Sequence, residues 1–284
     1  MEVVIGKTAG FCGGVFNSVK KTEEYLEEYG NLYCLGELVH NKHVVDKLTN
    51  KGLMIVDNLD DIFDSKVIVR AHGIPKEIYE LAKEHNVELL DLTCPKVLKI
   101  HDIAKDYVND GYYVVLIAKR DHPEAIGTYS YCGNNSFVLE NDTQIEDLVN
   151  NINNSSCNKV AIIAQTTFSV KGFNDLCELI KSQIVDKEIV INNTICNATS
   201  IRQEETERLS REVDTMIIVG GKNSSNTKKL YEVALRNCSN SIIIEDINDL
   251  DVSKIIDSKK VGVMAGASTP NECIDEVVNF LKGR

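Results

Sequence analysis

Three cysteines in this chain are each followed, at one fixed distance, by a loop rich in hydrogen-bond donors. The pairs are Cys12 and His40, Cys94 and His122, and Cys196 and Ser224. The differences 40 − 12, 122 − 94 and 224 − 196 all equal 28. A further polar loop closes each segment, at His72, Thr166 and Ser268. Repetition of this kind predicts three related structural units around one shared site.

Short runs rich in Val and Ile alternate with amphipathic helical patterns along the whole chain. This alternation predicts an α/β fold with parallel sheets and right-handed crossovers. The Asn-rich segment 150–155 is predicted to be a surface loop. The predicted strands are Val3–Ile5, Leu32–Leu35, Met54–Val56, Lys66–Arg70, Val87–Leu90, Tyr112–Ala118, Phe137–Leu139, Val160–Ala164, Glu188–Ile191, Thr215–Val219, Ile242–Ile244 and Val261–Ala265.

Charge and composition exclude several classes of partner. The net charge of the 284-residue chain is −12, which argues against nucleic acid or an anionic membrane surface. No apolar run approaches the roughly 20 residues that span a bilayer, and no leader peptide precedes the first strand. We therefore expect a soluble, cytoplasmic protein whose nine cysteines are free thiols or metal ligands.

The four prolines indicate where the polar loops lie. Each precedes a helical pattern, a position that proline favours, and lies close to a loop His, Cys or Ser. These loops are therefore expected at the carboxyl ends of strands, the edge where open α/β sheets bind ligands. The prolines are Pro75, Pro95, Pro123 and Pro270.

The cysteines divide into two groups. Free cysteines are usually small buried hydrophobes, and this is expected of Cys34, Cys157, Cys177, Cys238 and Cys273, within strand or helix patterns. Cys132 falls in a predicted turn and belongs to no motif. The three repeated cysteines instead lie where a helix begins, and the positive end of a helix favours the thiolate that binds metal. Three thiolates suit a [4Fe–4S] cluster with one iron left open, and zinc with three cysteines is the alternative.

Several polar residues near these cysteines are candidates for binding an anion or moving a proton. His43, His85 and His101 fall within helix patterns and are expected on solvated helix faces, unlike the three loop histidines. Residues 222–226 and 267–270 form donor-rich loops before helices, which bind anions well, although simple helix capping is the alternative. Glu124, in a first helical turn, becomes a proton donor if it is buried.

Nine motifs in order carry a resemblance over the whole chain. They are Gly10-Phe11-Cys12-Gly13-Gly14-Val15, Val39-His40-Asn41, Arg70-Ala71-His72-Gly73, Asp91-Leu92-Thr93-Cys94-Pro95, His122-Pro123-Glu124, Gln165-Thr166-Thr167, Thr194-Ile195-Cys196, Ser224-Ser225-Asn226 and Gly266-Ala267-Ser268. With these motifs the chain resembles the LytB/IspH family of 4-hydroxy-3-methylbut-2-enyl diphosphate reductases.

The resemblance implies a trefoil of three small parallel-sheet α/β lobes around a central iron–sulfur site. The expected lobes are residues 14–93, 94–193, and 194–284 together with 1–13. The implied [4Fe–4S] ligands are Cys12, Cys94 and Cys196. The implied substrate-binding residues are His40, His72, His122, Thr166, Ser224, Ser225, Asn226 and Ser268, and the implied catalytic residues are Glu124, His122 and Thr166.

The implied reaction is the reductive dehydroxylation of 4-hydroxy-3-methylbut-2-enyl diphosphate to isopentenyl and dimethylallyl diphosphate, the last step of the non-mevalonate pathway. An electron donor such as ferredoxin or flavodoxin is the implied partner. A non-catalytic iron–sulfur redox sensor and a cluster enzyme like quinolinate synthase are the alternatives. The chain departs from the family's usual sequence at Phe16-Asn17, where a basic pair is common, and at Asn197.

Overall fold

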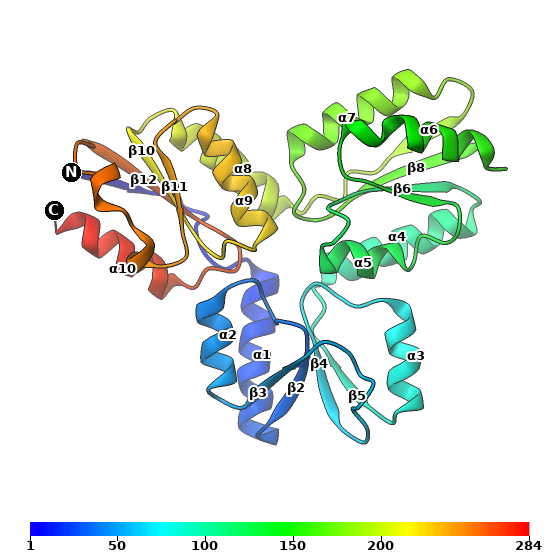
Figure 1. Cartoon of the computed structure of the whole chain (residues 1–284), viewed down its shortest axis with the longest axis horizontal. Helices are drawn as coiled ribbons and strands as arrows, with labels where there is room; N and C mark the ends of the chain where they lie inside the picture. The colour runs from blue at the N-terminus through cyan, green and yellow to red at the C-terminus, as the bar shows by residue number, and fades with distance from the viewer. Residues whose placement is uncertain (284) are drawn as a thin grey trace. The chain divides into compact units, whose positions relative to one another are not determined.

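The computed structural model describes residues 1–283, over which the chain forms three four-stranded parallel sheets (Figure 1). The strands are β1 (Glu2–Ile5), β2 (Leu32–Leu35), β3 (Leu53–Val56), β4 (Lys66–Val69), β5 (Glu88–Asp91), β6 (Tyr113–Ile117), β7 (Ser136–Leu139), β8 (Lys159–Ala164), β9 (Glu188–Ile191), β10 (Thr215–Val219), β11 (Ser241–Ile244) and β12 (Lys260–Ala265). The helices are α1 (Gly13–Tyr29), α2 (Lys42–Thr49), α3 (Lys76–Glu84), α4 (Pro95–Asn109), α5 (Pro123–Tyr129), α6 (Ile145–Asn154), α7 (Val170–Gln183), α8 (Asn197–Ser210), α9 (Ser225–Leu235) and α10 (Asn271–Lys282).

All three sheets have the same strand order. The orders are β3-β2-β4-β5, β7-β6-β8-β9 and β11-β10-β12-β1. In each sheet, the strand that comes first along the repeat (β2, β6 or β10) lies between the second and the third strands. The fourth strand (β5, β9 or β1) lies at the edge beside the third. The amino-terminal strand β1 completes the third sheet, where Val3 pairs with Val261 in parallel register. The predicted α/β class and every predicted strand are confirmed, with ends that differ by a residue or two.

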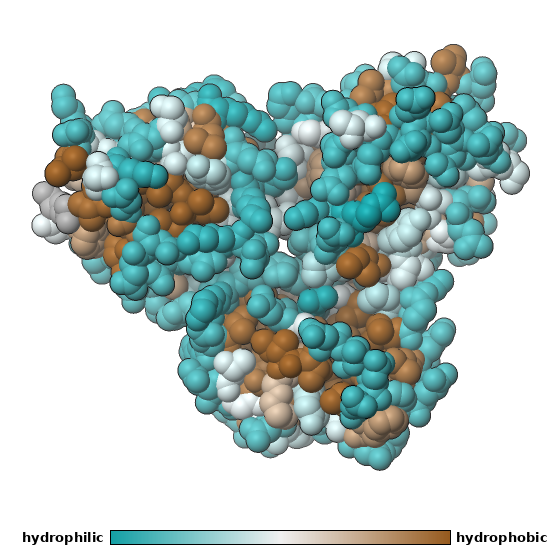
Figure 2. All heavy atoms as spheres, viewed as in Figure 1, coloured by the Kyte–Doolittle hydropathy of each residue, from teal (hydrophilic) through white to brown (hydrophobic). Residues whose placement is uncertain are grey.

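The β7-β6-β8-β9 sheet is covered on both faces, and alternate residues of β6 separate the two cores. Val115 and Ile117 pack with α6 and α7, whereas Val114 and Leu116 pack with α4 and α5. All four side chains are fully buried, as expected for a parallel strand between two helical layers. The visible outer surfaces of α6 and α7 are mainly hydrophilic (Figure 2).

The sheet that contains β1 has the same layered construction. Ile217 and Val219 of β10 pack against α10, whereas Met216 and Ile218 pack against α8 and α9. In the β3-β2-β4-β5 sheet, Val67 and Val69 of β4 face α3. Each buried aliphatic side chain contributes about 1.5–3 kcal/mol, so these cores hold the sheets rigidly beneath their loops.

The chain divides into two compact units. One comprises Met1–Gly30, Glu37–Gly52 and Asn197–Arg284, and the other comprises Asn31–Gly36 and Leu53–Cys196. The first unit contains the sheet with β1, and the second contains the other two sheets. Within the described residues, no helix has the length and apolar character needed to cross a membrane.

The prediction of a surface loop at residues 150–155 was wrong. Helix α6 continues through Asn154, because Leu148 and Ile152 lie one turn apart and are both fully buried against the sheet. The asparagines of this segment occupy the other positions of the same helix. The apolar spacing therefore outweighed the low helix propensity of asparagine.

Candidate active site

Each repeated cysteine lies between the edge strand of its sheet and the following helix. Cys12 follows β1 and directly precedes α1, Cys94 directly precedes α4, and Cys196 directly precedes α8. All three are partly exposed, unlike the six other cysteines, which are buried. The burial predicted for Cys34, Cys157, Cys177, Cys238 and Cys273 is thus confirmed, although Cys157 and Cys238 lie just outside regular elements.

A common backbone hydrogen bond fixes the three cysteines. The N–H groups of Cys12, Cys94 and Cys196 each donate over 3.0 Å to a carbonyl of a neighbouring loop. The acceptors are Ala267, Ala71 and Thr166, which follow β12, β4 and β8 respectively. In every sheet, therefore, the loop after the third strand of the repeat holds the cysteine that follows the fourth strand.

Glu124 and Thr166 form a buried pair in the second unit. The Thr166 N–H and hydroxyl donate to the two Glu124 carboxyl oxygens, each over 2.6 Å. Glu124 is 2% exposed, and this burial raises the pKa of its carboxyl to about 7 although both Thr166 bonds oppose the shift. A carboxyl with this pKa can hold and release a proton near neutral pH.

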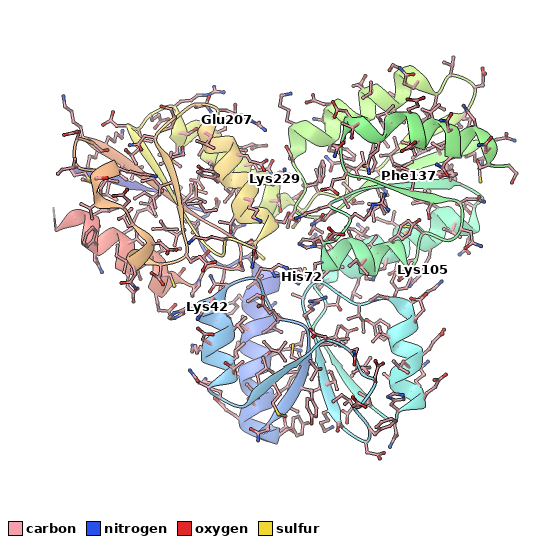
Figure 3. The ribbon with its side chains drawn as sticks, in the orientation of Figure 1. Lys42, His72, Lys105, Phe137, Glu207 and Lys229 are labelled. Atoms are coloured by element: carbon pink, nitrogen blue, oxygen red, sulfur yellow. The ribbon has the colours of Figure 1, made fainter. Side chains whose placement is uncertain are left out.

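His122 and His72 lie beside this pair. The Glu124 N–H donates to His122 Nδ1 over 3.1 Å, so Nδ1 is an acceptor and the ring carries its proton on Nε2. The rings of His72 and His122 meet edge to face, with centroids 5.3 Å apart. His72 follows β4, beside α5 (Figure 3). The second unit thus places two imidazoles and a protonatable carboxyl together.

In the first unit, the amino-terminal turn of α9 presents Ser224, Ser225 and Asn226. Ser224 caps the helix, and its hydroxyl accepts from the Thr227 N–H over 3.3 Å. Asn226 is 3% exposed, yet neither polar atom of its side chain has a hydrogen-bond partner among residues 1–283. A buried amide without partners costs free energy, so Asn226 is a candidate for binding a group that supplies those partners.

The His40 loop packs against the same region of the first unit. The Ser268 hydroxyl donates to the His40 carbonyl over 3.2 Å. Gly221 lies so close that a Cβ atom there would come within 2.3 Å of that oxygen. The His40 ring lies 3.7 Å from the Glu37 carboxylate, measured from Nδ1. The loop that follows β2 therefore contacts the loops that follow β10 and β12 through the His40 carbonyl.

Sequence reasoning missed two residues that hold the Cys12 loop. Glu205 on α8 accepts from the N–H groups of Lys7 and Thr8, over 2.8 and 2.9 Å, and from the Thr8 hydroxyl. The Arg202 guanidinium is buried and donates to the Gly10 carbonyl over 2.8 Å. The signal was available, since α8 has almost no apolar residues and so must pack through polar groups.

The prediction that His101 lies on a solvated helix face was wrong. His101 is 2% exposed and stacks on Tyr131 at 4.5 Å, because Gly73 leaves room for its ring. Burial and the nearby Lys105 charge lower the pKa of His101 to about 4, so the ring is neutral. His85 is also partly buried, with Nδ1 2.9 Å from the Leu59 carbonyl, whereas the structure confirms that His43 is exposed.

Comparisons with known proteins agree along the full chain. A family profile described as LytB protein matches residues 3–282. The 4-hydroxy-3-methylbut-2-enyl diphosphate reductase of Clostridioides difficile (strain 630) is 39% identical, over 99% of both chains. The enzyme of that name from Thermoanaerobacter pseudethanolicus is 36% identical, over 100% of this chain and 98% of its own.

Solved structures give the same result. The E-1-hydroxy-2-methyl-but-2-enyl-4-diphosphate reductase from Plasmodium falciparum aligns with a TM-score of 0.90 and 29% identity, over 99% of this chain and 88% of its own. A second structure, (E)-4-hydroxy-3-methyl-but-2-enyl diphosphate reductase, described as the terminal enzyme of the non-mevalonate pathway, aligns over the whole of both chains with a TM-score of 0.70 and 36% identity. The chain belongs to the LytB protein family.

Proposed function

We propose that this chain reduces 4-hydroxy-3-methylbut-2-enyl diphosphate, the last step of the non-mevalonate pathway. The reaction adds two electrons and two protons, breaks the bond between C4 and its hydroxyl oxygen, and releases water. The other product is isopentenyl or dimethylallyl diphosphate. Besides family membership, the observation that carries this proposal is the buried Glu124–Thr166 pair, since the reaction consumes protons away from bulk water.

Cys12, Cys94 and Cys196 are proposed to hold a [4Fe–4S] cluster. An all-thiolate set suits iron–sulfur chemistry, and these three are the partly exposed cysteines of the chain. Each has its backbone held by a neighbouring loop, which suits a ligand that must keep its place. When bound, the cluster supplies the two electrons one at a time.

Neutral donors are proposed to bind the diphosphate. The proposed set is His40, His72, His122, Thr166, Ser224, Ser225, Asn226 and Ser268. The buried Asn226 amide supports it, because a phosphate oxygen would satisfy the side-chain N–H groups. The Nε2 proton of His122 supports it as well, since it leaves a neutral ring that donates. Oriented neutral donors suit an anion in a chain of net charge −12.

Glu124 is proposed to deliver the protons. Its pKa of about 7 keeps a large fraction protonated at neutral pH, and Thr166 orients both carboxyl oxygens. A positioned general acid of this kind contributes about 10²–10⁴-fold to a rate. Thr166 and His122 complete the proposed catalytic group: Thr166 orients the carboxyl, and His122 accepts a hydrogen bond from the Glu124 N–H.

The proposal also covers the organisation and setting of the enzyme. The repeated strand order supports three lobes, residues 14–93, 94–193, and 194–284 with 1–13, around a central cluster. Nine cysteines with no disulfide among residues 1–283 suit a reducing compartment, so the cytoplasm is the proposed location. A ferredoxin or flavodoxin is proposed as the electron donor.

The test is anaerobic iron and sulfide analysis with EPR, while the substrate is titrated in. The expected result is close to four irons per chain and a spectrum that changes with the diphosphate. Cys94→Ser should lose iron, whereas the control Cys132→Ser, which alters a buried cysteine, should retain it. One bound zinc, or a cluster whose spectrum ignores the diphosphate, would contradict the proposal.

A further inference from the structure

The turns before two of the three proposed cluster ligands are stabilised by their own sequence. Asp91 lies three residues before Cys94, and its carboxylate accepts a hydrogen bond from the Thr93 N–H over 2.9 Å. Asn193 holds the same place before the third cysteine, and its side-chain oxygen accepts from the Ile195 N–H over 3.0 Å. A side chain that bonds the backbone two residues later forms an Asx turn, which restricts the chain locally. Both turns therefore reach their cysteine with a fixed backbone.

The Cys12 turn lacks this arrangement. Ala9 occupies the equivalent position three residues before Cys12, and its methyl group accepts no hydrogen bond. Arg202 of α8 contacts this turn instead. Its guanidinium donates from Nη2 to the Gly10 carbonyl over 2.8 Å and from Nη1 to the Ala198 carbonyl over 3.0 Å. One side chain thus joins the backbone two residues before Cys12 to the first turn of α8.

The same guanidinium places a buried positive charge close to this turn. Arg202 is 5% exposed, whereas Arg208 on the same helix is exposed. Arg202 lines a groove of about 330 Å³ together with Cys12 and Gly13, all within the first unit. Arginine stays protonated in proteins, so its charge is permanent. Water screens a buried charge weakly, so this charge acts strongly on groups around Cys12.

We propose that Arg202 is a positioning residue for Cys12 and that its charge raises the reduction potential of the cluster. The inference rests on the proposed function, in which Cys12 is one of the cluster ligands. Reduction adds negative charge, so a fixed positive charge beside a ligand stabilises the reduced state relative to the oxidised state. The two hydrogen bonds to backbone carbonyls hold the turn, and so keep the Cys12 thiolate where it binds iron.

Two substitutions separate the charge from the hydrogen bonds. Arg202→Lys keeps the charge, but a compact ammonium group cannot bridge both carbonyls as the planar guanidinium does. Arg202→Gln removes the charge and keeps a single donor group. Arg208→Gln is the matched control, because it removes the same charge from an exposed position of α8, where Arg208 pairs with Glu212 at 3.1 Å.

Potentiometric titration of the anaerobic holoenzyme, followed by EPR, measures the effect of the charge. In Arg202→Gln the equilibrium constant for one-electron reduction should fall about tenfold, which is a potential lower by about 59 mV. Arg202→Lys and the control Arg208→Gln should keep the wild-type potential. A wild-type potential in Arg202→Gln, or an equal decrease in Arg202→Lys, would overturn the role of the charge.

The rate of iron loss to a chelator measures the positioning role, and it requires no turnover. Both Arg202 variants should lose iron about tenfold faster than the wild type and Arg208→Gln, because the Cys12 turn is released. Arg202→Lys keeps the buried charge, so it tests positioning even if the glutamine variant does not fold. Equal rates in the wild type and Arg202→Lys would overturn that role. A wild type that holds no cluster would instead overturn the proposed function.

Discussion

Replacing Glu124 by glutamine tests the proton-delivery proposal and its electrostatic basis together. The Thr166 N–H can still donate to the amide oxygen, and the amide N–H₂ can donate to the Thr166 hydroxyl. The fold and substrate binding should therefore survive. The proton is lost, so kcat should fall by about 10²–10⁴-fold. Anaerobic dithionite-driven turnover measures kcat, and calorimetry measures the substrate Kd.

The pH dependence of the free energy of unfolding gives a second test of the same variant. Burial raises the pKa of Glu124 from its ordinary 4.5 to about 7. Below 4.5 the carboxyl is protonated in both folded and unfolded chains. Between 4.5 and 7 the unfolded chain ionises while the folded one holds its proton, so stability falls as pH rises. The loss is roughly 3 kcal/mol by pH 7, at about 1.4 kcal/mol for each whole pKa step.

Glu124→Gln cannot ionise and should not suffer this loss. Its stability relative to the wild type should therefore rise by roughly 3 kcal/mol between pH 4.5 and 7 in denaturant titrations. The exposed Glu146→Gln is the control and should show no such trend. A glutamine variant with a kcat within threefold of the wild type would refute the proton role. A relative stability independent of pH would refute the burial argument.

Three further substitutions probe other contacts. Asn226→Leu removes a buried amide without partners, so stability should be unchanged or higher in thermal melts. KM should rise about 5- to 150-fold from the lost 1–3 kcal/mol of binding, and a normal KM would exclude Asn226 from the binding set. Gly221→Ala forces a Cβ atom against the His40 carbonyl and should lower the free energy of unfolding by about 1–3 kcal/mol in urea titrations. The control Gly172→Ala adds a Cβ atom with only ordinary contacts and should not lower the free energy of unfolding. Equal effects of the two substitutions would refute the close approach at Gly221. Burial opposes the charge of Glu205, but the hydrogen bonds that its carboxylate accepts outweigh burial and lower its pKa, so the carboxylate stabilises the fold above the ordinary pKa of 4.5 and this stabilisation is lost as pH falls through the lowered pKa. Glu205→Gln should therefore lower Tm at pH 7 and should lose less stability than the wild type on acidification. An acid transition that is unchanged in this variant would contradict the argument.

Much of this protein follows from sequence alone, because its signals are local and repeated. Runs of Val and Ile between turn residues identify parallel strands, since such strands are buried on both faces. Prolines mark the starts of helices, as at Pro95 and Pro123, the first residues of α4 and α5. The spacing of 28 residues between Cys12 and His40 recurs in the two later repeats, and each of these segments contains one helix and the strand that follows it.

The tertiary structure decided properties that depend on neighbours distant in sequence. Nothing near Glu124 in the chain reveals that it is buried or that Thr166 binds both of its oxygens, and these contacts set its pKa. The burial of His101 depends on the space that Gly73 leaves open. Local patterns report which face of an element is apolar, whereas desolvation and hydrogen bonding depend on which side chains the fold brings against it.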